Sequence, residues 1–313
     1  MHVMQRTLMV LGLGLLGAVL IAPAIGDAVA VQSAPGYWLV GGDGGVFAFN
    51  APFYGSGTPS ASHGTPCGFP PPLAYDYQHQ FCTAIGATRS GSGYWLLNLW
   101  NPPIPYGQAG PAPSQNGCSV LNQPGYEVES DWVGVASSNS GGGYWLTSKL
   151  GLVMGCGDVT PPSGGPTSLR FNSPVVGITA TPDGKGYWLV GADGGVFAFG
   201  DALFAGSMGG MPVDAPVVGM APTGDGGGYW LVAADGGVFA FGDATFQGSM
   251  GGTSLNAPVV GIAVPPSGQG YWLAAEDGGV YSFGTAPFAG SMAGKALADP
   301  ITGVATYRGP SSG

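Results

Sequence analysis

Short apolar runs alternate with turns rich in Gly, Pro and Asp along most of the chain. In the cleanest copy, the runs 187–190 (Tyr-Trp-Leu-Val) and 196–199 (Val-Phe-Ala-Phe) flank an Asp-Gly turn. Asp-Gly between two apolar runs predicts a β-hairpin. A shorter apolar run at 175–178 precedes this hairpin, and a weaker one at 204–207 follows it. The pattern therefore predicts units of four short antiparallel strands.

This unit repeats at a nearly fixed period. Three near-identical copies occupy 174–215, 216–257 and 258–299. The Tyr-Trp pair occurs six times, marked by Trp38, Trp95, Trp145, Trp188, Trp230 and Trp272. Four short strands in a unit of about 42 residues are typical of a β-propeller blade, and a solenoid is the alternative. We expect an all-β fold of six four-stranded blades.

The two ends of the pattern complement each other. The first Tyr-Trp copy, at Tyr37, has no first strand before it, whereas 301–306 resembles a first strand with no Tyr-Trp copy after it. A solenoid would leave open sheet edges at its ends, and a closed ring removes them. We therefore predict that the C-terminal strand completes the N-terminal blade and closes the ring.

The first 30 residues predict export. Arg6 precedes an apolar run at 8–21, and Ala-Val-Ala at 28–30 fits a cleavage site after Ala30. These are the parts of a secretory signal peptide, with an uncleaved anchor as the alternative. No later segment has the roughly 20 apolar residues of a membrane span. We expect no transmembrane segment after cleavage and a secreted, cell-surface or wall-associated protein.

The mature part divides into a regular and an irregular portion. We assign 31–307 to the propeller and 308–313 to a C-terminal tail. Within the propeller, 56–173 is irregular: long connections rich in Pro, Gly and Ser precede the first strands of the second and third blades. Long connections of this kind tend to be functional or flexible.

The repeats resemble those of exported bacterial β-propeller repeat proteins of the actinobacterial type. The shared motif is Gly-Tyr-Trp-Leu-Val-x-x-Asp-Gly-Gly-Val-Phe-x-Phe-Gly-Asp-Ala, which is nearly intact at 186–202 and 228–244. The resemblance covers most of 36–306 and implies a propeller fold and an extracytoplasmic location. The blades are more distantly similar to those of kelch, WD-repeat and lectin propellers. The second blade departs most, with Trp-Asn-Pro-Pro at 100–103 in place of Asp-Gly-Gly.

Composition narrows the range of functions. The chain contains 61 Gly and 28 Pro, but 45% of its residues are hydrophobic and its aromatic residues recur regularly, which favours a packed core over disorder. The net charge of −10, with 8% charged residues, gives no basic surface for nucleic acid or for acidic lipids.

Two repeated residue types have alternative interpretations. The Tyr-Trp pairs resemble the sugar-stacking platforms of lectins, but their place in the most apolar strand favours packing between blades. The hairpin aspartates Asp43, Asp193, Asp235 and Asp277 supply oxygen ligands that suit calcium, although Asp is also an ordinary turn residue. We favour the structural interpretation of both and expect no cofactor.

All four cysteines lie in the irregular portion. We predict the disulfides Cys67–Cys82 and Cys118–Cys156, because each would join an irregular connection to a neighbouring strand. The alternative is a zinc site, whose ligands would be His63, Cys67, His79 and Cys82.

The leading functional hypothesis is a non-enzymatic exported propeller that binds a protein or an extracellular or cell-wall glycan. A glycan-binding lectin is the first alternative, and a hydrolase or lyase is the less favoured second one, for which we assign no catalytic residue. Irregular sequence, cysteines and aromatic residues converge on one part of the chain. The candidate partner contacts are Phe69, Tyr75, Tyr77, His79, Trp100, Tyr106 and Tyr126.

Overall fold

The computed structural model describes residues 34–58, 82–98, 103–110, 118–119, 132–159 and 170–309. These residues belong to one compact unit, Ser33–Gly313, whose regular structure is entirely β-strand in the described ranges. The predicted signal peptide at 1–30 lies outside the described residues. Within the described ranges there is no helix of the length and apolar character needed to span a membrane.

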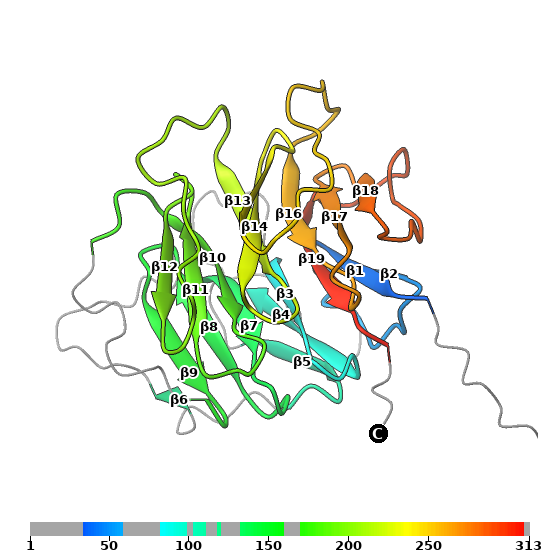
Figure 1. Cartoon of the computed structure of the whole chain (residues 1–313). Helices are drawn as coiled ribbons and strands as arrows, with labels where there is room; N and C mark the ends of the chain where they lie inside the picture. Colours follow the sequence, from blue (N-terminus) through cyan, green and yellow to red (C-terminus); the bar gives the residue numbers. More distant parts are fainter. Residues whose placement is uncertain are drawn as a thin grey trace, which may run out of the picture. The chain divides into compact units, whose positions relative to one another are not determined.

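The strands form six sheets, which we number as blades 1 to 6 (Figure 1). Blade 1 contains β1 (Gly36–Gly41), β2 (Val46–Phe49) and β19 (Ile301–Tyr307), and blade 2 contains β3 (Cys82–Ala87), β4 (Gly93–Asn98) and β5 (Ile104–Gly107). Blade 3 contains β6 (Cys118–Ser119), β7 (Trp132–Ser137), β8 (Tyr144–Ser148) and β9 (Val153–Cys156). Blade 4 contains β10 (Val175–Ala180), β11 (Tyr187–Gly191) and β12 (Val196–Phe199). Blade 5 contains β13 (Val217–Pro222), β14 (Gly228–Ala233) and β15 (Val238–Gly242), and blade 6 contains β16 (Val259–Ala263), β17 (Gly270–Ala275) and β18 (Val280–Gly284).

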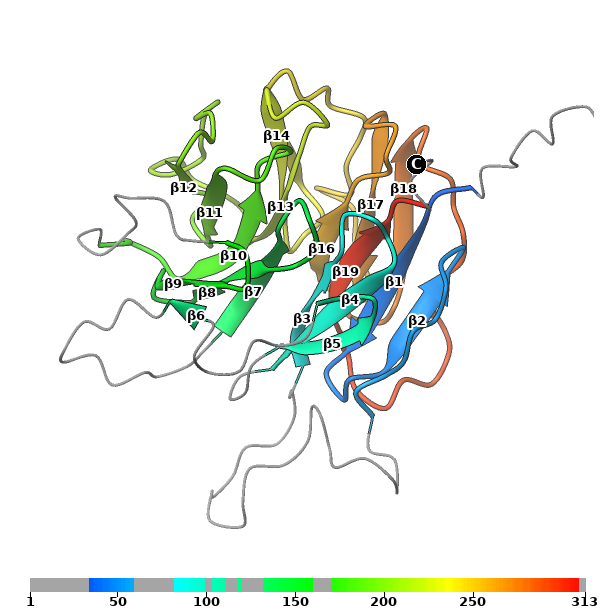
Figure 2. The ribbon, with the colours of Figure 1, turned by 90° about the horizontal axis from the view of Figure 1, so that it is seen from below.

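Blade 1 combines the two ends of the described chain. Strand β19 pairs antiparallel with β1, so that Gly36 lies opposite Tyr307 and Leu39 lies opposite Val304. Blue β1 and red β19 are therefore neighbours in Figure 2. The inner strands of successive blades contact one another in the order β19, β3, β7, β10, β13 and β16, and β16 also contacts β19.

The prediction of four strands in every blade is not confirmed. Within the described residues five sheets have three strands and blade 3 has four, in the order β6-β9-β8-β7. Its extra strand comes from the connection before the blade, whereas the predicted strand followed the hairpin. The predicted fourth strand at 204–207 is irregular because Ala205 N–H and the Gly206 carbonyl bond to the hydroxyl of Tyr229 in blade 5 instead of to β12.

The Tyr-Trp pairs form the core between blades, as the sequence predicted. All twelve side chains are at most 2% exposed. Each tryptophan contacts the tyrosine of the next blade, with ring centroids 5.0–6.1 Å apart: Trp38–Tyr94, Trp95–Tyr144, Trp145–Tyr187, Trp188–Tyr229, Trp230–Tyr271 and Trp272–Tyr37. An aromatic pair of this kind stabilises by about 0.5–1.5 kcal/mol beyond the burial of its area.

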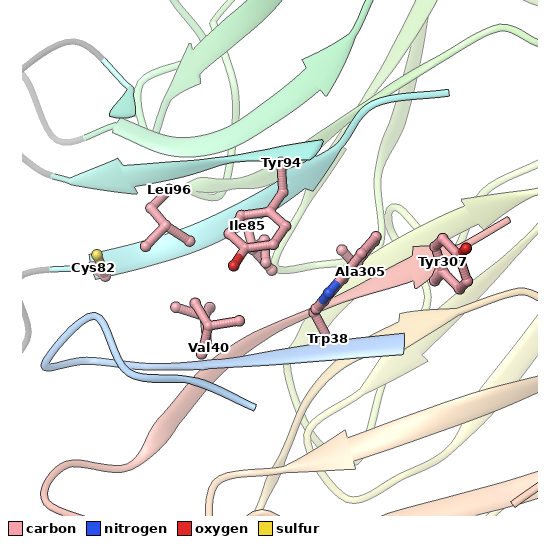
Figure 3. Close-up of a cluster of buried hydrophobic side chains, with 9 residues drawn as sticks. Trp38, Val40, Cys82, Ile85, Tyr94, Leu96, Ala305 and Tyr307 are labelled. Carbon is pink, nitrogen blue, oxygen red and sulfur yellow. The ribbon is translucent and has the colours of Figure 1, made fainter. Parts of the chain in front are cut away.

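Figure 3 shows one such junction, between blades 1 and 2. Trp38 from β1 and Ala305 from β19 pack with Tyr94 and Ile85 of blade 2 in a single cluster of buried side chains. Residues from the beginning, the end and the second repeat of the described chain thus share one core.

Candidate functional site

Most residues proposed from the sequence to contact a partner lie outside the described residues. These are Phe69, Tyr75, Tyr77, His79, Trp100 and Tyr126. The seventh, Tyr106 in β5, lies in the junction between blades 1 and 2: its ring packs 5.6 Å from that of Tyr94, and its hydroxyl donates a hydrogen bond of 2.9 Å to the Ser56 carbonyl. Burial raises the pKa of the Tyr106 hydroxyl. Tyr106 therefore contributes to packing between blades.

Cys82 and Cys156 are each part of a disulfide bond. Cys118 in β6 lies directly opposite Cys156 in β9. Cys67 lies outside the described residues, as do His63 and His79 of the alternative zinc site. The pairing of the cysteines remains the prediction made above.

The hairpin aspartates act in their turns. In blades 1, 4, 5 and 6 the carboxylate accepts a hydrogen bond of 2.8–3.0 Å from the N–H two residues later, as in Gly195 N–H to Asp193. This is the Asx turn that Asp favours. Among the residues that the structure describes, no three His, Cys, Asp or Glu side chains come together in a way that could hold a metal ion.

The segment after the third strand of blade 5 is held at two points. In blade 5, the Trp230 indole N–H donates to the Thr245 carbonyl at 2.9 Å, which ties the segment to its own blade. The hydroxyl of Tyr271, in blade 6, accepts from Gln247 N–H at 3.1 Å and donates to the Gly248 carbonyl. We call this second attachment the tyrosine latch, because it ties the segment to the next blade.

The same tyrosine latch is present at four of the six junctions between neighbouring blades. Tyr37, Tyr94 and Tyr229 donate to the carbonyls of Gly290, Gly55 and Gly206, respectively. The four latch glycines have φ between +126° and +140°, where side chains are disfavoured. A Cβ on any of them would also lie 2.5–2.6 Å from an aromatic ring of the next blade. Glycine is thus required at the latch for both backbone and steric reasons.

At the two remaining junctions the described residues form no latch. Among these residues the buried hydroxyls of Tyr144 and Tyr187 have no hydrogen-bond partner, and burial alone raises the pKa of both groups. In the sequence, Pro113 and Ser163 take the places of the latch glycines before these tyrosines. The loss coincides with the irregular portion of the chain.

Between its two anchors, each latched segment presents one phenylalanine to solvent. These four side chains form what we call the rim arc: Phe53 is 59% exposed, Phe204 57%, Phe246 56% and Phe288 62%. They occupy the same repeat position in blades 4, 5, 6 and 1, which follow one another through the latches. One exposed apolar side chain is ordinary, and these four are distinguished by their recurrence at the same repeat position on neighbouring blades.

The rim arc was not predicted, although a signal for it is present in the sequence. Phe-x-Gly follows the Tyr-Trp pair in four copies, with the phenylalanine 16 residues after the tryptophan in three of them and 15 residues after it in the first. In the other two copies the residues 16 positions after the tryptophan are Pro111 and Pro161. The interpretation of 204–207 as a β-strand concealed this signal, because the side chains of a blade-edge strand would alternate between the two faces of the sheet, towards the neighbouring blades.

Comparisons with known proteins give similarity to solved structures. No protein-family model and no curated protein match the chain. It is similar to the β-propeller domain of Cps50 (Swd1) from Myceliophteria thermophila, with a TM-score of 0.42 and 11% sequence identity over 70% of each chain. The class follows from the chain's own structure: six antiparallel sheets, with inner strands that contact one another in sequence, make it a β-propeller.

Proposed function

We propose that this chain is an exported, non-enzymatic β-propeller that binds a partner protein through the rim arc. The observation that carries the proposal is the recurrence of an exposed phenylalanine on four successive blades. Aromatic side chains are enriched at the centres of protein interfaces, where their large area is buried on binding. The two anchors of each segment fix the backbone beside the ring, which lowers the entropy lost when a partner binds.

The surroundings of the rim arc favour an apolar protein segment over a glycan. The segments 202–211 and 286–294 contain no charged residue, and Asp201 lies just before the first of them. 

The equivalent segment of blade 5, 244–253, also contains no charged residue. Their serines are engaged internally: Ser207, for example, accepts a hydrogen bond of 2.9 Å from Gly209 N–H. Sugar recognition needs polar groups that converge beside an exposed ring.

Three features support the finer parts of this proposal. The apolar run and cleavage motif within 1–30 support export, and disulfide bonds at Cys82 and Cys156 suit an oxidising compartment. The pairing of β1 with β19 and the contact of β16 with β19 support a closed ring. We retain the two long connections of the irregular portion as a second contact area, together with the disulfide pairs Cys67–Cys82 and Cys118–Cys156.

The test replaces Phe204, Phe246 and Phe288 together by Ser. These side chains are more than half exposed, so we expect the triple variant to fold, which circular dichroism checks. The tagged protein is cross-linked on the surface of the producing cells, and captured proteins are quantified by mass spectrometry. We expect a partner that wild type and the control Leu150→Ser capture and the triple variant loses. Leu150 is a suitable control because it is 64% exposed and lies in blade 3, outside the rim arc.

Two results would count against this function. Equal capture by the triple variant and wild type would exclude the rim arc as the binding surface. Binding to a glycan array that disappears in the triple variant would instead support the lectin alternative.

A further inference from the structure

A cavity of about 270 Å³ lies among the inner strands. Its floor carries one apolar side chain from the same position of each inner strand: Ile85, Val135, Ile178, Met220, Ile262 and Val304. A molecule of water occupies about 30 Å³ in the liquid, so the cavity has room for roughly nine groups of that size.

Two arginines lie at the mouth of this cavity. Arg89 follows β3 and Arg308 follows β19, and they are the only charged residues among the described residues that line the cavity. One Nη of Arg89 donates a hydrogen bond of 2.9 Å to the Thr181 carbonyl, which holds this guanidinium in place. Within the described part of the chain, Arg308 has no hydrogen bond or ion pair.

Among the described residues, no carboxylate forms an ion pair with either arginine. The acid that acts on Arg89 is Asp183, whose carboxylate lies 3.0 Å from the Lys185 ammonium and accepts a hydrogen bond of 2.9 Å from the Thr181 hydroxyl. Burial lowers the pKa of Arg89, the charge of Arg308 lowers it further, and Asp183 opposes both effects. Burial of the guanidinium also lowers the pKa of Arg308, although the residue as a whole is exposed.

Two neighbouring cations above an apolar floor are complementary to an anion with an apolar body. We propose that this cavity binds a small organic anion whose carboxylate or phosphate group lies between the guanidinium groups of Arg89 and Arg308. Guanidinium groups match the geometry of both oxyanions and bind them through charge-assisted hydrogen bonds. The apolar part of the ligand lies against the six inner-strand side chains, and the cavity limits this part to about nine non-hydrogen atoms, while the anionic group lies at the arginines. This site is separate from the rim arc and does not depend on the proposed function.

Calorimetric titration of the purified full-length chain tests the proposal. The probes are benzoate, phenyl phosphate, inorganic phosphate and benzamide, the uncharged analogue of benzoate. We expect benzoate or phenyl phosphate to bind, inorganic phosphate to bind more weakly and benzamide not to bind. The stronger of the first two probes identifies the preferred anionic group.

Variants then locate the site. Arg308→Gln removes one cation without breaking a hydrogen bond of the described structure, so we expect it to fold and to bind the anion at least about tenfold more weakly. Lys295→Gln removes the same charge from an exposed turn outside the cavity, and we expect it to bind as wild type does. The proposal is overturned if no anionic probe binds, if benzamide binds as tightly as benzoate, or if Arg308→Gln leaves the affinity unchanged.

Discussion

Replacing Tyr271 and Tyr187 individually by Phe compares a latched tyrosine with an unlatched one. Tyr271→Phe leaves Gln247 N–H and the Gly248 carbonyl without their partner, and an unsatisfied buried group costs about 1–3 kcal/mol. The ring contacts persist in this variant, because they do not involve the hydroxyl. Tyr187→Phe removes a buried hydroxyl that has no partner among the described residues, so we expect a change below about 0.5 kcal/mol or a gain in stability.

Equilibrium unfolding in urea and calorimetric melting both measure the difference. A loss of 1–3 kcal/mol corresponds to a decrease in Tm of roughly 2–8 °C for Tyr271→Phe. We expect Tyr187→Phe to melt at or above the wild-type temperature. An equal loss in the two variants would refute the reasoning, because it would mean that the latch does not distinguish these junctions. An unchanged Tm for Tyr271→Phe would show that the latch contributes no stability.

Three further predictions follow from the junctions between blades. Gly206→Ala should lower the free energy of unfolding in urea by about 2–4 kcal/mol, because the added Cβ meets an aromatic ring. Gly210 also has a positive φ but no atom within 4 Å of its Cβ position, so Gly210→Ala should lower it by about 1 kcal/mol. Equal losses in the two variants would contradict this explanation. Burial raises the pKa of the Tyr144 hydroxyl to about 12 in the folded protein, whereas its pKa in the unfolded chain is about 10. The stability that depends on the neutral hydroxyl should therefore be complete below pH 10 and should be lost as the pH rises towards 12. Its loss should appear in alkaline unfolding followed by phenolate absorbance, and an unfolding free energy independent of pH between 10 and 12 would contradict it. Deleting 301–313 removes β19 from blade 1 and should lower Tm markedly. Deleting 310–313 leaves β19 complete and should leave Tm unchanged. Similar Tm values for the two deletions would argue against the completion of blade 1 by β19.

Much of the fold follows from local patterns. The Tyr-Trp runs and Asp-Gly turns identify the hairpins, and the offset between the run at 301–306 and the first pair at Tyr37 anticipates the pairing of β19 with β1. Each of these features depends on neighbouring residues or on counting repeats, which a sequence provides directly. The fourth strand was wrong because a side chain of another blade competes for its backbone groups. A propensity for extended structure does not reveal such a competitor.

The candidate sites were less accessible to prediction. The exposure of Phe246 depends on its backbone being held by Trp230 and Tyr271, which lie in different blades. Arg89 and Arg308 follow no repeat pattern in the sequence, and they reach one cavity only because β19 lies beside β3. Sites assembled from distant parts of the chain require the spatial order of the blades.

The register of β1 and β19 has a mechanical consequence. Gly36, where β1 begins, lies opposite Tyr307, where β19 ends. A force that pulls the two ends of the chain apart therefore acts on the same end of this strand pair. Its hydrogen bonds would be loaded one after another, as in unzipping, and not all together, as in shear. We expect stretching from the two termini to peel β19 from blade 1 at low force, and the remaining blades to be exposed to the load afterwards.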